Sequence, residues 1–294
     1  QLKNFKADGS MQDNPKAQSG ALYIVATPIG NLEDITLRSL RILREVDLIA
    51  AEDTRHTRKL LSACSIATRL ISLHEHNEKK KSAFLIGQLA SGLNVAYVSD
   101  AGTPGISDPG QSLVEAAHAA GIRVVPVPGP CAAVAALGVS GFSSDSFLFY
   151  GFLPAKPAAK ERELANLKAC RQTLIFYEAP GRFADTLTRM KQTLGDREIV
   201  VGREMTKVHE EIRRARISEF LENRILGAEK GEFVIVVRAE EAPKCVATDE
   251  DIEEALKRLF AAEDCSVRDA ADQVSRQTGA SRKRVYSVAV KLRT

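Results

Sequence analysis

Thr27-Pro28-Ile29-Gly30-Asn31-Leu32-Glu33-Asp34 and Ser99-Asp100-Ala101-Gly102-Thr103-Pro104-Gly105-Ile106-Ser107-Asp108-Pro109-Gly110 are two loops rich in glycine and proline, and each follows a short apolar run. Glycine lacks a Cβ and proline lacks a backbone N–H, so such loops fold closely around a small molecule. In open α/β sheets, ligands bind beyond the carboxyl ends of the strands. The two loops therefore predict a small-ligand site.

Short apolar runs alternate with helical patterns on either side of these loops. The expected strands are 21–26, 46–51, 70–73, 94–99 and 123–127, and the expected helices include 36–44, 78–91 and 111–120. Such alternation is typical of βαβ units with a largely parallel sheet. A second set of apolar runs follows a switch near residue 142, at 147–152, 173–177, 198–202 and 233–237. We therefore predict an α/β protein with an N-terminal domain over 20–141 and a second α/β domain over 142–242.

The last part of the chain, residues 243–294, predicts a helical unit. Apolar residues from Ile252 to Phe260 recur at helical spacing, Ser266 begins a capping-box pattern, and Gly279 supplies a turn before a last helix. This arrangement resembles a helix-turn-helix module. Six lysines or arginines and no acidic residue lie between Gln273 and Thr294, so this face is suited to phosphates, although a solvated basic surface is the alternative.

Composition sets the outer bounds. The chain has 294 residues, 44% of them hydrophobic, and a net charge of +3, which by itself does not identify a nucleic-acid binder. Five widely spaced cysteines argue for free thiols rather than disulfides or a zinc site. No run is long and apolar enough for a membrane helix or a secretory signal, so we expect a cytoplasmic protein. Residues 1–10 precede Met11 and resemble a tag, and 1–19 are expected to be disordered.

Three familiar kinds of site are excluded by spacing. The first loop has one glycine where a dinucleotide fingerprint needs G-x-G-x-x-G, and no G-x-x-x-x-G-K-[ST] run for a triphosphate occurs. His74-Glu75-His76-Asn77 lacks a third ligand at an obvious spacing, so we expect no metal. His76 and Asn77 are instead candidates for contact with RNA, with a solvated loop as the alternative.

Six ordered motifs resemble the tetrapyrrole methylase superfamily. They are 25–36 (VATPIGNLEDIT), 51–55 (AEDTR), 98–104 (VSDAGTP), 128–133 (PGPCAA), 149–154 (FYGFLP) and 176–178 (FYE). The resemblance runs from about Gly20 to Ala239, and it is strongest to members that act on ribosomal RNA and carry an added helical unit. It implies a two-domain, non-Rossmann methyltransferase fold, S-adenosylmethionine as cofactor, and a homodimer. The implied reaction is 2′-O-methylation of a cytidine in the decoding region of 16S rRNA, either naked or within the small ribosomal subunit.

The resemblance also implies which residues hold the cofactor. On the two opening loops these are Thr27, Pro28, Gly30, Asp100, Ala101, Gly102, Thr103 and Pro104. Elsewhere they are Pro130, Cys131, Ala132, Phe176, Tyr177, Met205, Thr206, Gly231 and Glu232. From the residues alone, Asp100 either accepts a hydrogen bond from the cofactor or forms an Asx turn, and Cys131 is a small packing residue rather than a nucleophile.

Methyl transfer to a hydroxyl needs alignment and a proton acceptor, and no covalent enzyme intermediate. The candidates for catalytic roles lie near strand ends: Glu52, Asp53, Arg55, Glu178, Glu204 and Lys207. The sequence does not choose among them, because Asp53 and Arg55 equally fit an ion pair and Glu52 a dimer contact.

Further candidates for RNA contact are basic: Lys156, Arg203, Arg282, Lys283 and Arg284. Neighbouring acids leave open the alternative of an ordinary charged surface. Two other functions are weighed against RNA methylation. One is methylation of a small corrin or tetrapyrrole precursor, which would have no use for the basic tail, and the other is a non-catalytic nucleic-acid-binding protein.

Overall fold

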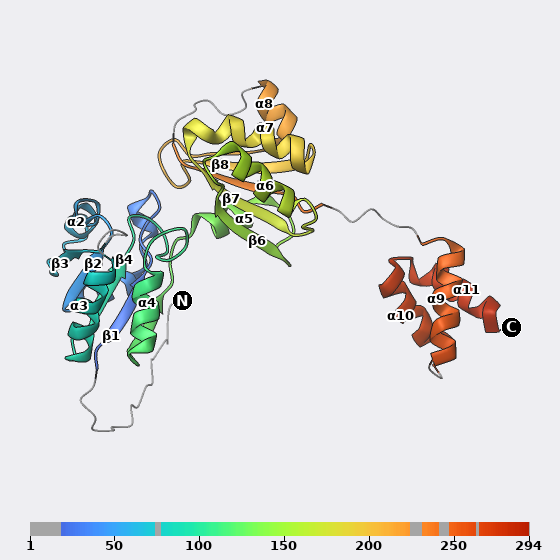
Figure 1. Cartoon of the computed structure of the whole chain (residues 1–294), viewed down its shortest axis with the longest axis horizontal. Coiled ribbons are helices and arrows are strands. Elements are labelled where there is room, and N and C mark those ends of the chain that lie inside the picture. Colours follow the sequence, from blue (N-terminus) through green and yellow to red (C-terminus); the bar gives the residue numbers. More distant parts are fainter. Residues whose placement is uncertain (1–18, 74–77, 224–230, 241–246, 263–264, 294) are drawn as a thin grey trace, which may run out of the picture. The chain divides into compact units, whose positions relative to one another are not determined.

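The computed structural model describes residues 19–73, 78–223, 231–240, 247–262 and 265–293 (Figure 1). They fold into two compact units, of which the first ends at Arg238 and the second begins at Ala239. The expected tag over 1–10 and the segment 74–77, for which no metal was expected, lie outside the described residues. The expected boundaries at 142 and 243 stay predictions.

The first sheet is fully parallel, as the alternating pattern predicted. Its strand order is β3-β2-β4-β1-β5. β1 and β4 are therefore neighbours inside the sheet, and β3 and β5 form its two edges. Its elements are β1 (Ala21–Val25), η1 (Leu32–Asp34), α1 (Leu37–Glu45), β2 (Leu48–Ala51), α2 (Thr54–Ala63), β3 (Leu70–Ser72), α3 (Glu78–Ala90), β4 (Val95–Val98), α4 (Gln111–Ala119) and β5 (Arg123–Val127).

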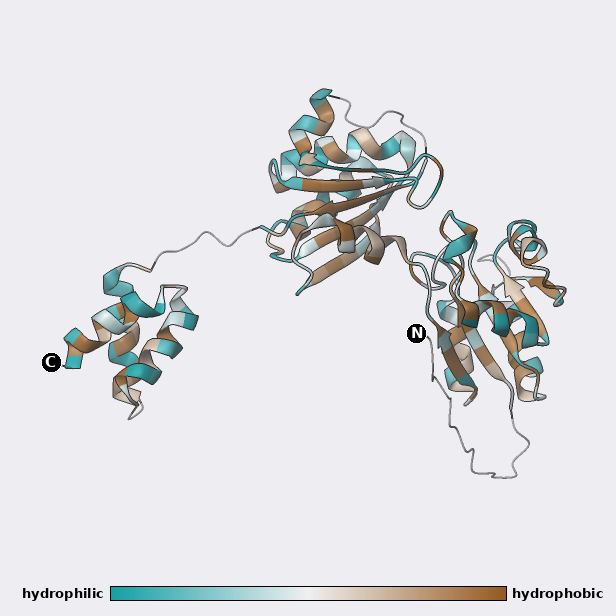
Figure 2. Ribbon diagram, turned by 180° about the vertical axis from the view of Figure 1, so that it is seen from behind, coloured by the Kyte–Doolittle hydropathy of each residue, from teal (hydrophilic) through white to brown (hydrophobic). Residues whose placement is uncertain are grey.

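Helices cover both faces of this sheet, which is why its central strands are continuous apolar runs. Leu85 of α3 and Leu113 of α4 belong to the core on one face. Leu43 of α1 and Leu61 of α2 belong to the core on the other. Figure 2 shows the hydrophobic strands between helices whose outer sides are hydrophilic. The carboxyl ends of β1 and β4 lead into the two opening loops.

The second sheet is mixed, with strand order β6-β7-β10-β8-β9. Only β6 and β7 run parallel, and the other neighbours are antiparallel. Its elements, with the helix that precedes them, are α5 (Ala132–Ser140), β6 (Phe147–Phe152), α6 (Pro157–Leu167), β7 (Thr173–Glu178), η2 (Pro180–Arg182), α7 (Phe183–Leu194), β8 (Glu198–Arg203), β9 (Glu211–Arg216), α8 (Ile217–Asn223) and β10 (Phe233–Val237).

Two cores hold this second sheet. One face packs against α6, α7 and α8 through residues such as Leu164, Met190 and Phe220. The opposite face packs against α5, whose Ala133, Ala136 and Leu137 bring this helix close to the strands. Small side chains permit that approach.

The C-terminal unit contains α9 (Asp249–Ala262), α10 (Val267–Thr278) and α11 (Arg282–Arg293). The Ser266 side chain caps α10 by accepting a hydrogen bond from the Asp269 N–H at 3.1 Å, as the capping pattern predicted. Gly279 ends α10 in the left-handed region at φ 68°. Val274, Val285 and Ala289 are fully buried in the small core that joins the three helices.

Three expectations from composition can be compared with the described residues. Cys64, Cys131, Cys170 and Cys265 are free, whereas Cys245 lies outside the described part of the chain. No group of His, Cys, Asp or Glu side chains arranged to hold a metal occurs within the described ranges. None of the helices described there has the length and apolar character to cross a membrane.

Candidate active site

The two opening loops are joined to each other by backbone hydrogen bonds. The Thr27 N–H donates to the Gly102 carbonyl at 2.8 Å, and the Gly102 N–H donates back to the Thr27 carbonyl at 3.1 Å. Gly102 has φ +80°, and a Cβ there would lie 3.3 Å from Ile29 Cγ2. The backbone angle therefore favours glycine, and any Cβ would also press against the Ile29 side chain.

A cavity of 390 Å³ lies against these loops, which is a volume typical of small-molecule sites. Loop residues of the first sheet form one part of its lining, and the end of β7, the start of α5 and the start of β10 form the rest. The lining residues include Ile29, Asp100, Ala101, Gly102, Thr103, Ile106, Ser107, Asp108, Cys131, Ala132, Phe152, Tyr177, Glu178, Met205, Glu232 and Phe233. Both sheets of the first unit therefore contribute to one cavity.

The charge of this lining has one sign. Asp100, Asp108, Glu178 and Glu232 line the cavity, and no lysine, arginine or histidine does so among the described residues. Aromatic rings accompany the carboxylates, since Phe152 lies edge-on to Tyr177 with ring centroids 5.6 Å apart. This combination suits a ligand with a flat ring and positive charge.

Tyr177 ties the second sheet to the start of α5. Its hydroxyl oxygen accepts a hydrogen bond from the Ala133 N–H at 3.1 Å, where α5 leaves N–H groups unpaired. Burial raises the pKa of Tyr177, and nearby Cys131 adds to the shift. The phenol therefore stays neutral and is no general base near neutral pH.

Glu178 is fully occupied by donors. Its Oε1 accepts from Arg182 Nε at 2.6 Å and from the Ala179 N–H at 2.8 Å, and its Oε2 accepts from Thr186 Oγ1 at 2.5 Å. Lys160, which is 1% exposed, donates to Thr186 Oγ1 and to Asp185 Oδ2, both at 2.8 Å. This network, which we call the Glu178 network (Lys160, Glu178, Arg182, Asp185 and Thr186), fixes the turn after β7.

Glu204 and Lys207 form a second closed set of contacts. Lys207 Nζ donates to Glu204 Oε1 at 2.8 Å and to Glu232 Oε2 at 3.1 Å. Although burial opposes both shifts, these bonds lower the pKa of Glu204 and raise that of Lys207. Lys207 is therefore protonated near neutral pH and does not accept a proton there.

The turn that carries these residues lies against the first loop. A Cβ at Gly30 would lie 2.4 Å from Lys207 Cγ and 2.9 Å from Thr206 Oγ1. Glu204 and Thr206 have φ 49° and 66°, an uncommon region for residues other than glycine. Thr206 Oγ1 is buried without a hydrogen-bond partner in the described structure. The turn thus brings strained backbone and an unsatisfied hydroxyl to the first loop.

Glu52 and Asp53 connect β2 to α2, and their environments differ. Hydrogen bonds from Arg55 lower the pKa of Asp53 to about 2, and Asp53 Oδ1 also caps α2 by accepting from the Arg55 N–H at 2.8 Å. Burial and the negative charges of Asp100 and Asp108 raise the pKa of Glu52 above its usual 4.5. Burial likewise raises the pKa of Asp108. Glu52 and Asp108 are the carboxyl groups here whose affinity for a proton is increased.

A smaller cavity of 140 Å³ shares Asp100 with the main cavity. Thr27, Pro28 and Leu32 of the first loop line it, together with His56, Thr57, Lys59 and Leu60 of α2. The Asp100 carboxylate accepts a hydrogen bond from the Asp53 N–H at 3.0 Å. The shared aspartate therefore connects the main cavity to a second site with basic side chains.

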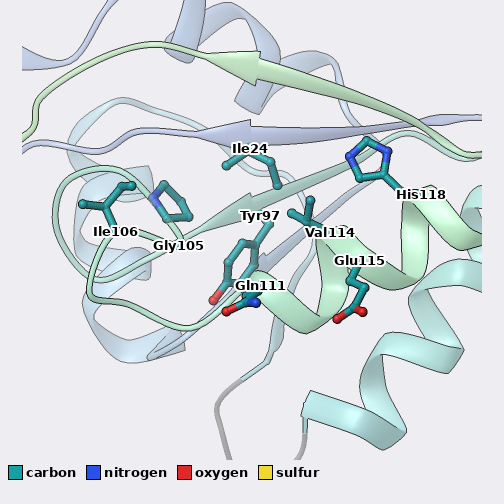
Figure 3. A pocket seen from close by; sticks show the side chains of 10 residues that line it. Ile24, Tyr97, Gly105, Ile106, Gln111, Val114, Glu115 and His118 are labelled. Carbon is teal, nitrogen blue, oxygen red and sulfur yellow. The ribbon is translucent and has the colours of Figure 1, made fainter.

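A third cavity, of 580 Å³, lies between the second loop and α4 (Figure 3). Figure 3 shows Gln111, Val114 and His118 of α4 with their side chains at this cavity. Pro104, expected at the cofactor site, lines this third cavity, and Ile106 lines both. It carries one carboxylate, Glu115, and lacks the acidic cluster of the main cavity.

The predicted cofactor residues are distributed over several places. Asp100, Ala101, Gly102, Thr103, Cys131, Ala132, Tyr177, Met205 and Glu232 line the main cavity. Thr27 and Pro28 line the smaller one, and the Pro130 carbonyl accepts from Thr103 Oγ1 at 3.0 Å. Phe176 is fully buried in the core on the other face of the second sheet, and Gly231 packs against Glu204. The cofactor assignments themselves stay predictions.

The residues predicted to touch RNA also differ in their surroundings. Lys156 is exposed just before α6, whereas Arg203 is 8% exposed and donates to Glu211 Oε2 at 3.2 Å. Arg282, Lys283 and Arg284 begin α11. His76 and Asn77 lie outside the described residues.

Several lining residues were not singled out from the sequence. Asp108 and Ile106 belong to the second opening loop, which the sequence analysis predicted as part of a ligand site without naming them. Their place in that loop was the signal that could have identified them. Phe152 ends β6, and Phe233 begins β10 beside the predicted Glu232. His56 and Lys59 carried no signal, because α2 was not predicted as a helix.

Comparison with known proteins gives two family matches. The model of the tetrapyrrole (corrin/porphyrin) methylases matches residues 21–221, and that of the RsmI C-terminal HTH domain matches residues 246–293.

Individual proteins agree with these matches. The chain is 50% identical over 236 residues to ribosomal RNA small subunit methyltransferase I of Vibrio cholerae, covering 77% of this chain and 81% of that protein. It is 48% identical over 276 residues to the protein of that name from Haemophilus influenzae, covering 91% and 95%. Among solved structures, uroporphyrin-III C-methyltransferase of Thermus thermophilus complexed with S-adenosylhomocysteine has the same fold, with a TM-score of 0.53 at 19% identity over 74% of this chain and 97% of that one.

Proposed function

Because this chain belongs to the tetrapyrrole (corrin/porphyrin) methylase family, we propose that it is an S-adenosylmethionine-dependent methyltransferase of small-subunit ribosomal RNA. The observation that carries the proposal is the acidic and aromatic cavity formed by the two opening loops and the second sheet. The names of its relatives and the match of its C-terminal unit support RNA as the acceptor.

The residues of the main cavity fit this cofactor in charge and shape. S-adenosylmethionine carries a sulfonium and an ammonium, and the lining supplies four carboxylates. Arg182 pairs with Glu178 and Lys207 with Glu232, whereas Asp100 and Asp108 form no ion pair among the described residues. Phe152 and Tyr177 offer apolar surface to the adenine, and Asp100 and Asp108 offer acceptors to hydroxyl and ammonium groups. When bound, the cofactor supplies an electrophilic methyl group.

We propose the 2′-hydroxyl of a cytidine in the decoding region of 16S rRNA as the acceptor. The smaller cavity supports a separate acceptor site, since it meets the main cavity at Asp100 and carries His56 and Lys59. A lysine at that position is suited to a phosphate of the incoming strand. The two cavities would thus hold donor and acceptor on either side of one aspartate.

A hydroxyl acceptor must lose a proton, and we assign its removal to Glu52. Glu52 follows β2 directly and lies near Asp100, the residue that both cavities share, and near Asp108. Their charges and burial raise its pKa, and a raised pKa makes a carboxylate a better proton acceptor. The other predicted candidates have different tasks. Asp53 and Arg55 pair with each other, Glu178 is held by three donors, and Glu204 and Lys207 pair together.

The alternative of a small corrin or tetrapyrrole substrate is less well supported. The solved relatives that act on such molecules share the fold at about 20% identity or less, whereas the ribosomal RNA enzymes are 43–50% identical. A non-catalytic nucleic-acid-binding function is also less well supported, because it does not account for the acidic cavity.

We further propose that the protein works as a homodimer in the cytoplasm. Support for a second copy comes from α5, which packs one side on the second sheet while Val134 and Val139 on its outer side are 58% and 57% exposed. Exposed apolar side chains on one helix mark interaction surfaces.

The deciding experiment incubates the protein with labelled cofactor and either naked 16S rRNA or assembled small subunits, followed by mapping of the labelled nucleotide. We expect label on the ribose of a single cytidine with at least one of these substrates. Label on neither RNA, together with cofactor binding by calorimetry, would contradict the proposed acceptor but not the methyltransferase assignment.

A further inference from the structure

We propose that the C-terminal unit binds single-stranded RNA at one defined patch, in which Tyr286 stacks on a base while Lys283 and Arg268 contact phosphates. This inference rests on the proposed function, because it takes RNA as the partner. Of the six cations between Gln273 and Thr294 it selects Lys283, and it adds Arg268 and Tyr286, which share a surface hollow with that lysine. We call Arg268, Lys283 and Tyr286 the α10–α11 patch.

The patch surrounds a hollow in the surface. Arg268 of α10 and Arg282, Lys283 and Tyr286 of α11 line a hollow of 590 Å³. Arg268 and Lys283 are exposed, and Tyr286 is 46% exposed. A tyrosine on a helix whose other side buries Val285 and Ala289 is not needed for the core. Its ring is therefore available to a partner.

The cations of this unit are not equivalent. Arg282 pairs with Asp272 through two nitrogens, and Arg284 Nε donates to Asp249 Oδ1 at 2.8 Å. The Arg293 guanidinium lies 4.7 Å from the centre of the Phe260 ring. These three arginines hold the helices of the unit together. Arg268 and Lys283 have no ion-pair partner within the described residues, so their charge faces solvent at the hollow.

The shape of RNA favours a single strand as the occupant. The major groove of duplex DNA admits an α-helix, but that of A-form RNA is too deep and narrow for side chains to read. A helix-turn-helix module that meets RNA thus has no duplex groove for α11. An exposed aromatic ring that shares a hollow with two unpaired cations instead fits an unstacked base with its neighbouring phosphates.

The test measures binding of the full-length protein to a fluorescent RNA oligonucleotide, presented as a single strand and as the corresponding duplex, without methyl donor and over a series of salt concentrations. We expect tighter binding of the single strand. Tyr286→Ala should weaken that binding about tenfold, whereas Tyr286→Phe keeps the ring and should bind like the wild type. Lys283→Gln should lower the slope of log affinity against log salt by about 0.7, the value of one phosphate contact.

Lys257→Gln is the matched control, because it makes the same exchange at an exposed lysine of α9 that pairs with Glu253 and does not line the hollow. It should leave both the affinity and the salt slope close to those of the wild type, and thermal unfolding checks that each variant is folded. Three results would each overturn the proposal: preference for duplex RNA, unchanged RNA affinity in Tyr286→Ala, or equal effects of Lys283→Gln and Lys257→Gln on RNA binding. If the wild-type protein binds the single-stranded RNA as expected but transfers no methyl group to 16S rRNA, the proposed function is contradicted and the patch remains supported.

Discussion

At the scale of single residues, the proposed chemistry depends on the charge of Glu52. A carboxyl group accepts a proton only while ionised, so the raised pKa shifts the start of activity to higher pH than an ordinary glutamate would. Asp53, one residue away, has its pKa lowered to about 2 by Arg55 and remains ionised through the working range. Two adjacent acids thus differ in their suitability for proton transfer.

We expect Glu52→Gln to lower kcat about a hundredfold with little change in cofactor affinity, since it removes the proton acceptor and keeps a similar shape. In the wild type, kcat should rise with pH through an apparent pKa above 4.5 and then level off. That rise should be absent in Glu52→Gln but present in Asp53→Asn, the matched control. If kcat of Glu52→Gln still rises with pH, Glu52 is not the proton acceptor, and Asp108, the other acid with a raised pKa, becomes the candidate.

Gly105 and Gly110 of the second loop offer a comparison of backbone strain with close contact. Both have positive φ, at +81° and +125°, but a Cβ at Gly110 would lie 2.4 Å from Tyr97 Cε1, whereas one at Gly105 has nothing within 4 Å. We expect Gly105→Ala to cost about 1 kcal/mol of unfolding free energy, from strain alone.

Gly110→Ala should cost about 2 kcal/mol more than Gly105→Ala, because Tyr97 must move from a packed position. Urea unfolding measures both costs. Equal losses of unfolding free energy in the two variants would show that the Tyr97 ring moves aside without a cost in stability.

At the scale of elements, the Glu178 network explains how the turn after β7 is held at the cavity. Removing one partner of a buried charge cluster leaves the others without compensation. We expect Lys160→Ala to lower the free energy of unfolding by about 3 kcal/mol. Lys168→Ala, an exposed lysine at the end of the same helix, should change it by less than about 0.5 kcal/mol. A small effect of Lys160→Ala in thermal or urea unfolding would show that the three donors to Glu178 hold it without Lys160.

The elements that the sequence predicted are those with simple patterns. β2 and β4 are buried on both faces and β1 over most of its length, so their apolar runs were visible, and Ser266 marked the start of α10. β9 was missed because it is an edge strand with four charged residues out of six, which leaves no apolar run. α5 was seen only as an alanine-rich stretch, because its apolar residues face in all directions.

In the candidate site too, features with a local sequence pattern were predicted and features that depend on distant contacts were not. The meeting of the two opening loops followed from where parallel strands end. The choice among six catalytic candidates did not, because it depends on contacts between distant residues, such as Thr186 with Glu178 and Glu232 with Lys207. His56 and Lys59 became visible only once α2 was placed beside the first loop.

At the scale of the whole molecule, the proposed homodimer is open to a direct test. We expect Val134→Glu combined with Val139→Glu to convert the dimer to a monomer in light scattering, because two charges on the outer side of α5 oppose burial. Val208→Glu is the matched control, since Val208 is 96% exposed on a turn and should leave the mass unchanged. A wild-type monomer, or a dimer that survives the double substitution, would contradict the interface on α5.

Asp100 lies in the linings of both the main and the smaller cavity, and this shared position has a thermodynamic consequence. A molecule that fills either cavity changes the solvation and charge around the same carboxylate. Occupation of one cavity must then alter the affinity of the other, and linkage makes the two effects equal in size. Donor and acceptor are therefore expected to bind cooperatively, with one coupling free energy whichever of them arrives first.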